Sequence, residues 1–143
     1  MKDVSLFLEV EPVAWQRPKT RIVKGWVQHY SPSKTKNYEK LIAEMYRHRG
    51  KVYWEKDEPI CISIHFSMPI PKSTPTGKRA KMVAGDIAHT KRPDVDNLTK
   101  SVLDALNGVA WADDSQIVHL SVVKQYAEKP SIWLHIFDSE GAE

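Results

Sequence analysis

Apolar and polar residues alternate along several stretches of the chain, which is the pattern of half-buried β-strands. The clearest is 60–68, where every second residue is apolar and Pro69 and Pro71 follow. Residues 4–10 alternate in the same way, and residues 117–126 and 131–137 are rich in β-branched and aromatic residues. The link Ala127–Pro130 between the last two stretches is short, so we expect them to pair as a hairpin.

Two other stretches follow the helical period. In 33–49, apolar residues recur at the spacing of one helix face, and Gly50 is expected to stop the helix. In 96–108, an apolar stripe lies opposite a polar stripe and Gly108 is expected to close the helix. The order strand-helix-strand-helix-strand-strand predicts an α+β (mixed α/β) fold with two helices packed on one mixed sheet. The 143 residues are predicted to form a single domain, 1–143.

Composition excludes several classes of protein. With 41% hydrophobic and 27% charged residues, the chain has the composition of a globular protein, and no apolar run approaches the about 18 residues of a membrane helix. The first residues lack the apolar core of a signal peptide, so we expect a cytoplasmic protein with no membrane partner. A single cysteine, Cys61, excludes an internal disulfide and a cysteine-based zinc site. The six histidines show no close metal-binding spacing, and His65, His119 and His135 are expected on wet faces of strands.

Positive charge is concentrated in two segments although the net charge is only +3. Residues 12–36 and 69–93 hold 12 of the 21 basic residues and 1 of the 18 acids, and their prolines predict loops. Two basic loops on one small domain favour a polyanionic partner, of which nucleic acid is the commonest, over two solvated loops without a partner. Trp54, Trp111 and Trp133 are expected to pack; for Trp15 and Trp26, which flank the first segment, base stacking is the alternative to packing.

Carboxylates gather before and after the second predicted helix. Pro93 favours extended backbone, and an extended chain through 94–96 would place Asp94 and Asp96 on one side with Asp96 as the N-cap. Asp113 and Asp114 follow the helix after a short turn. Clustered carboxylates repel one another unless a hard cation such as Mg²⁺ lies between them.

Lys100 lies one helical turn beyond Asp96, where it can stabilise charge on a phosphate or assist a nucleophilic water. Each feature also has a simpler interpretation. The aspartates can be helix caps and turn residues, and Lys100 and Asp104 can be a surface i,i+4 pair.

The segment 93–118, PDVDNLTKSVLDALNGVAWADDSQIV, resembles the signature of the RusA family of Holliday-junction resolvases, the crossover-junction endodeoxyribonucleases. That signature is D-x-D-N-x-x-K, then D-A-L, then D-D-x-Q-I/V. The matching residues here are Asp94, Asp96, Asn97, Lys100, Asp104, Ala105, Leu106, Asp113, Asp114, Gln116 and Ile117. Arg17-Pro18-Lys19 and the strands from 124 to 137 extend the resemblance more weakly.

The resemblance implies a small homodimeric enzyme that resolves four-way DNA junctions by paired symmetric nicks in recombination and repair, with Mg²⁺ or Mn²⁺. It implies that Asp94, Asp96 and Asp114 are catalytic metal-binding carboxylates and that Lys100 is an accessory catalytic lysine. It implies that Asp113 either supports a ligand without binding the metal or is an alternative ligand. The candidate nucleic-acid contacts are Arg17, Lys19, Arg21, Lys91, Arg92 and Lys124. The alternatives are a junction-binding protein without activity, a metal-dependent nuclease for other branched DNA or RNA, and a globular domain whose acids are caps and turns.

Overall fold

The computed structural model describes residues 1–17, 19–30 and 33–139 and contains the four predicted strands. They are β1 (Asp3–Leu8), β4 (Ile60–Pro69), β5 (Ile117–Ala127) and β6 (Ser131–Asp138), in the sheet order β1-β6-β4-β5. β4 and β5 are parallel, and the other two neighbouring pairs are antiparallel. The predicted mixed sheet is therefore confirmed.

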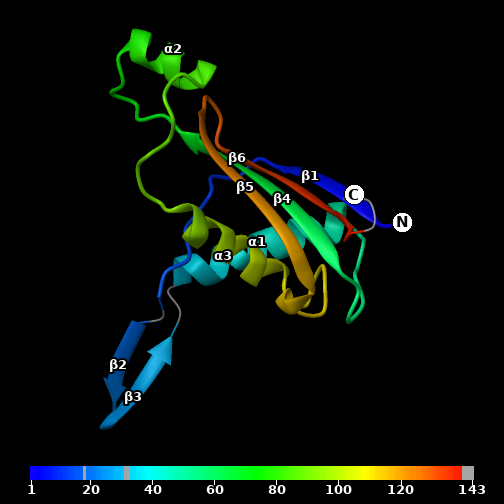
Figure 1. Ribbon diagram of the computed structural model, residues 1–143. Helices are drawn as coiled ribbons and strands as arrows, with labels where there is room; N and C mark the ends of the chain where they lie inside the picture. The colour runs from blue at the N-terminus through cyan, green and yellow to red at the C-terminus, as the bar shows by residue number, and fades with distance from the viewer. Residues whose placement is uncertain (18, 31–32, 140–143) are drawn as a thin grey trace.

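Helices α1 (Ser33–Arg49) and α3 (Val95–Leu106) pack together on one face of this sheet, which confirms the prediction of two packed helices (Figure 1). Alternate side chains of β1, β4 and β6 meet the apolar stripes of both helices and are lost from water, which is the main favourable term in folding. Gly108 follows α3 in the left-handed conformation (φ 81°), as expected for a helix stop. The fully buried centre contains Ile42, Ile60, Ile62, Ile64, Phe66, Leu98, Val102, Leu106, Ile132 and Ile136.

The basic segment 12–36 is not a continuous loop as predicted. It contains an antiparallel hairpin of β2 (Lys19–Val23) and β3 (Trp26–Tyr30). The turn residues Lys24 and Gly25 have φ of 52° and 81°, which is the backbone that a tight two-residue hairpin requires. The described side chains of both strands are exposed, so no alternation of buried and exposed positions announces them in the sequence.

The second basic segment, 69–93, also differs from the predicted loop, because it contains helix α2 (Thr76–Ala84). Met82 is the one buried residue of this helix. It packs with Ile70, Tyr126 and the partly buried Ile87 in a small cluster separate from the main core. One buried position in nine residues gives almost no helical periodicity to detect.

The predicted hairpin between the last two strands is wrong, since β4 lies between β5 and β6. No residue of β4 is exposed, whereas most of β5 is. The most apolar strand therefore takes a central position and pairs on both edges, and residues 128–130 cross its end. Of the helices that the structure describes, none is both long and apolar enough to cross a membrane.

Candidate active site

The backbone at the start of α3 differs from the sequence prediction. Asp94 is extended (φ −74°, ψ 149°) and occupies the N-cap position, and the helix begins at Val95. The Leu98 N–H donates to the Asp94 carbonyl oxygen (3.1 Å), so the first turn is closed with its N-cap two residues before Asp96. The expectation of an extended chain through 94–96, with Asp96 as the N-cap, is therefore wrong. Asp96 lies within the first turn, and its side chain belongs to the helix face.

A cavity beside α3 brings together residues that are far apart in the sequence. Asp96, Lys100 and Asp104 line it from α3 at helical spacing, and Asp114 lines it from the segment before β5. Its remaining lining is mostly apolar: Val95, Thr99, Leu103, Leu120 and Val122. Sequence reasoning placed Asp104 in the family signature and in a pair with Lys100 but not among the site residues. Its spacing of four residues from Lys100 and eight from Asp96 was the available signal.

Lys100 is held within the cavity by two neighbours. Its Nζ lies 3.3 Å from Asp104 Oδ2, which confirms the predicted i,i+4 pair. The same Nζ lies 4.9 Å from the centre of the Trp15 ring, within the range of a cation–π contact. The backbone N–H of Trp15 donates to the Asn97 carbonyl oxygen (2.9 Å), so the segment before β2 is fixed to α3 at this point.

Asp114 is oriented by a buried tryptophan. It begins a short 3₁₀ turn, Asp114–Gln116, and its Oδ1 accepts a hydrogen bond of 2.7 Å from Nε1 of Trp111, which is fully buried. Burial raises the pKa of Asp114, the Trp111 hydrogen bond opposes this, and the carboxylates of Asp104 and Asp113 raise the pKa further. Such a crowded carboxylate gains stability from any cation bound beside it. Sequence reasoning assigned Trp111 to packing alone.

Asp113 faces a different environment although it is adjacent in sequence. Its exposed carboxylate caps the 3₁₀ turn by accepting from the Ser115 N–H (2.9 Å), and the Asp113 N–H donates to Gln116 Oε1 (2.9 Å). The hydrogen bonds from Ser115 lower the pKa of Asp113. Asp113 is not among the residues that line the cavity with Asp114.

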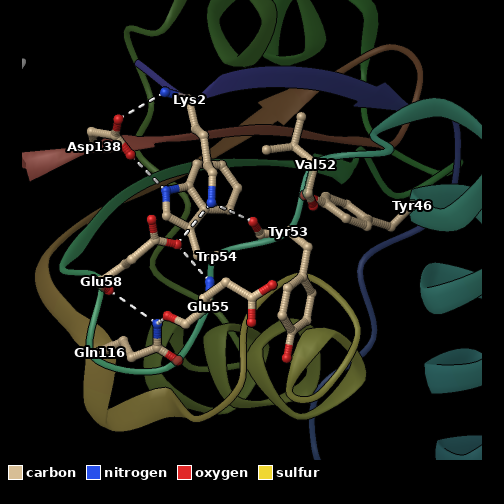
Figure 2. Close-up of polar contacts among 9 residues, drawn as sticks. All are labelled: Lys2, Tyr46, Val52, Tyr53, Trp54, Glu55, Glu58, Gln116 and Asp138. Carbon is tan, nitrogen blue, oxygen red and sulfur yellow. Dashed lines mark hydrogen bonds and ion pairs between the residues drawn. The ribbon is translucent and has the colours of Figure 1, made fainter.

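Gln116 attaches this turn to the rest of the domain. Its buried amide Nε2 donates to the carbonyl oxygens of Glu55 (2.6 Å) and Glu58 (3.0 Å), as Figure 2 shows in part. The segment that contains Glu55 and Glu58 is itself fixed, because Lys2 Nζ contacts Glu58 Oε2 at 2.8 Å. The position of Asp114 is therefore determined by hydrogen bonds that reach across the sheet end.

A second polar group in Figure 2 closes that end. Trp54 Nε1 donates to Asp138 Oδ1 (2.7 Å), and the Lys2 N–H donates to Asp138 Oδ2 (2.7 Å). These hydrogen bonds lower the pKa of Asp138. They join the first strand, the last strand and the segment before β4.

Asp94 lines a neighbouring depression with Ala14, Arg92, Pro93 and Asn97, rather than the cavity that contains Asp96. Lys124 Nζ donates to the carbonyl oxygens of Lys91 (2.8 Å) and Pro93 (3.0 Å), so it fixes the segment that leads into Asp94. The Arg92–Pro93 peptide bond is cis.

The remaining candidate nucleic-acid contacts lie in the two basic segments. Arg17, Lys91 and Arg92 are exposed. Arg21 is also exposed, and its Nε donates to Gln28 Oε1 (2.8 Å) within the hairpin. The side chain of Lys19 lies outside the part of the chain that the structure describes.

The donor set of the cavity suits a hard cation. Within residues 1–17, 19–30 and 33–139, no three His, Cys, Asp or Glu side chains are grouped closely enough to hold a metal by themselves. Three carboxylates nevertheless line one cavity; that of Asp104 is paired with Lys100, which leaves those of Asp96 and Asp114 for a cation. Mg²⁺ is usually held by one or two carboxylates and completes its shell with waters and substrate phosphates. The residues present therefore fit Mg²⁺ in kind and number.

Comparison with known proteins identifies the relatives of this chain. Residues 9–136 match the family model described as endodeoxyribonuclease RusA. A protein named crossover junction endodeoxyribonuclease rusA from Lactococcus phage r1t is 33% identical over 130 residues, which cover 90% of this chain and 92% of the phage protein. YqaN from Bacillus subtilis strain 168, described as uncharacterized, is 38% identical over 125 residues, which cover 85% of this chain and 87% of YqaN.

Proposed function

We propose that this chain, which belongs to the RusA family of endodeoxyribonucleases, resolves four-way DNA junctions by a pair of symmetric, Mg²⁺-dependent nicks. Membership of the family makes it a Holliday-junction-resolving endonuclease by class. The finer proposal is that it acts as a homodimer in the cytoplasm during recombination and repair. The observation that carries it is the cavity lined by Asp96, Lys100, Asp104 and Asp114.

The roles that we assign follow from this arrangement. Asp96 and Asp114 would hold the ion, with Asp94 beside them in the next depression. Asp113 would support Asp114 by capping its turn, or would serve as an alternative ligand. When bound, Mg²⁺ or Mn²⁺ supplies Lewis acidity and lowers the pKa of a water. Aspartate oxygens are the ligand type that both ions favour.

Lys100 supplies the positive charge of the cavity. Its Nζ would contact a phosphate oxygen and stabilise the negative charge that develops on the phosphate in the transition state. Asp104 contacts that amine at 3.3 Å and orients it. Leu103, Leu120 and Val122 form the apolar side of the cavity.

Binding of the DNA arms is assigned to the basic segments. Arg17, Lys19, Arg21, Lys91 and Arg92 would contact phosphates, so affinity should fall steeply with salt. Lys124 was predicted in the same role, and its hydrogen bonds to the backbone before Asp94 add a positioning role. A two-fold dimer would present two identical cavities to a junction that itself has two-fold symmetry.

The test is cleavage of a synthetic four-way junction with and without Mg²⁺, beside linear duplex, forked DNA, flap DNA and RNA. Asp96→Asn removes one carboxylate from the cavity, whereas Asp57→Asn removes one carboxylate from an exposed position outside the cavity and both basic segments. We expect paired nicks on the four-way junction, abolished by Asp96→Asn and retained by Asp57→Asn.

Three results would contradict the proposal. Tight junction binding without cutting under Mg²⁺ or Mn²⁺ would indicate a binding protein. Preferred cutting of forks, flaps or RNA would indicate a nuclease of different specificity. Absence of any binding would indicate a globular domain in which the aspartates serve only as helix caps and turn residues.

A further inference from the structure

The tip of the β2–β3 hairpin exposes an unusual amount of apolar surface. Ile22 is 77% exposed, Trp26 79% and Val27 66%. Figure 1 shows the hairpin extending away from the sheet and from all three helices. A two-stranded hairpin without a covering layer is only marginally stable in water, and exposed apolar groups of this kind mark contact surfaces.

The apolar residues occupy both faces of the tip. Val23 pairs with Trp26, and the next rung pairs Ile22 with Val27. Side chains of cross-strand partners share a face and successive rungs alternate, so Val23 and Trp26 lie on one face and Ile22 and Val27 on the other. The tip is therefore a thin structure with an apolar surface on each side, a shape suited to insertion between two flat partners.

Charge restricts the identity of the partner. Residues 12–36, which include the hairpin, contain six basic residues and no acid. A partner that is polyanionic and also offers flat apolar faces is nucleic acid with accessible bases. Aromatic side chains stack on such bases, and apolar side chains wedge between base steps.

A four-way junction offers accessible base faces at one place. Along an intact arm, each base pair is covered by a neighbour on both sides, and separating two neighbours costs free energy. At the branch point the continuity of stacking is interrupted, so insertion requires less unstacking than elsewhere. The branch point is therefore where a two-faced apolar tip meets the least resistance.

We infer that the hairpin tip, residues 22–27, inserts at the branch point of a four-way DNA junction with Trp26 stacked on an exposed base. This inference rests on the proposed function, because it takes the junction as the substrate. In this role Arg21 and Lys24 contact phosphates beside the branch point, and the tip recognises the shape of the junction independently of base sequence.

The test compares Trp26→Ala with wild type for binding to a junction and to linear duplex, with EDTA present to prevent cutting. Trp26→Phe keeps an aromatic ring, and Phe7→Ala removes an exposed aromatic residue (53%) from β1, outside the basic segments. We expect Trp26→Ala to weaken junction binding by about 5-fold to 150-fold, the range for loss of one stacked base contact. Duplex affinity and the salt slope should not change, because no charge is removed.

A second measurement locates the contact and does not depend on any variant. A junction with 5-iodouracil at the branch point is irradiated in complex with the wild-type protein, and the crosslinked peptide is identified by mass spectrometry. We expect the crosslink in the tryptic peptide 25–34, which contains Trp26, and not when 5-iodouracil lies in the middle of an arm.

Several outcomes would overturn the inference. They are an unchanged junction affinity in Trp26→Ala, an equal loss on junction and duplex, or a crosslink in another peptide. If Trp26→Ala weakens dimerisation, and the dimers that still form bind the junction as tightly as wild type, the tip contacts a second copy of the chain instead of DNA. Wild-type protein that fails to prefer the junction over duplex would instead refute the proposed function, whatever the behaviour of Trp26→Ala.

Discussion

Replacement of Trp111 by phenylalanine removes one hydrogen bond from Asp114 while it keeps an aromatic ring in the core. The indole Nε1 donates to Asp114 Oδ1 at 2.7 Å, and a hydrogen bond to a charged group contributes about 1.5–3 kcal/mol. Trp54 provides a matched control. It is equally buried, lies in a segment paired with that of Trp111, and donates to Asp138 Oδ1 at the same distance.

Both Trp111→Phe and Trp54→Phe should lower the free energy of unfolding by similar amounts, roughly 1.5–3 kcal/mol, in urea titrations. Only Trp111→Phe should affect cleavage, because only its partner lines the cavity. Loss of a group that orients a metal ligand typically costs about 10-fold to 100-fold in metal affinity or activity. Single-turnover cleavage measured across a range of Mg²⁺ concentrations should show a higher Mg²⁺ requirement for Trp111→Phe and an unchanged one for Trp54→Phe.

The reasoning would be refuted if both variants lost cleavage equally, since the effect would then follow stability. Unchanged cleavage by Trp111→Phe at limiting Mg²⁺ would also refute it, because Asp114 would then need no fixed orientation. Cleavage should be measured under conditions in which both variants are fully folded, so that an effect of lost stability is not mistaken for an effect of lost Asp114 orientation.

Further predictions concern charge, position and assembly. Arg17→Ala and Arg92→Ala should each weaken junction binding and reduce its salt slope by about one, measured by titration at several salt concentrations; unchanged slopes would remove these residues from the interface. Lys124→Met should slow cleavage with little change in the salt slope, since its amine holds the backbone that leads into Asp94. A slope reduced by one would instead indicate a phosphate contact. The pKa of Asp138 is lowered in the folded state, so its stabilisation is present above the unfolded value of about 3.9 and is lost as the pH falls through the folded value. Asp138→Asn should therefore unfold at lower urea concentration at pH 7, and its stability should fall less than that of wild type when the pH is lowered below about 3.9. Urea titrations at the two pH values measure this, and an unchanged loss of stability in acid would exclude Asp138 as its source. Light scattering should show a dimer at micromolar concentration, and a monomer both with and without DNA would contradict paired cutting.

The elements that the sequence predicts well are those with a buried face. The alternation in 60–68 and the helical stripe in 96–108 both arise from contact with the common core, and both elements are present. The β2–β3 hairpin and α2 bury almost nothing, so the same reasoning has no signal to detect there. The position of β4 between β5 and β6 also follows from burial. It can be predicted only by comparing the apolar content of several strands, because the pattern within one strand does not tell where in the sheet that strand lies.

The candidate site was predictable in its residue types more than in its geometry. Asp96, Lys100 and Asp114 come together in one cavity, although the local backbone at Asp96 differs from the prediction. Asp104 lies on α3 at helical spacing from Asp96 and Lys100, so the sequence carried a signal for it, whereas Asp114 joins them only because α3 runs past the start of β5. The hydrogen bond from Trp111 depends on the sharp turn before Asp114, and the sequence gives no measure of that turn.

The place of β6 in the sheet has a consequence for the order in which the molecule can fold during synthesis. Among the strands described it is made last, yet it lies between β1 and β4, and β1 has no other strand partner in the part of the chain that the structure describes. A nascent chain that ends before residue 131 can pair β4 with β5 but leaves β1 without a neighbour and one edge of β4 open. The sheet can therefore be completed only after β6 leaves the ribosome. Until then the nascent chain exposes unpaired strand edges, which favour aggregation, and it cannot form the folded nuclease.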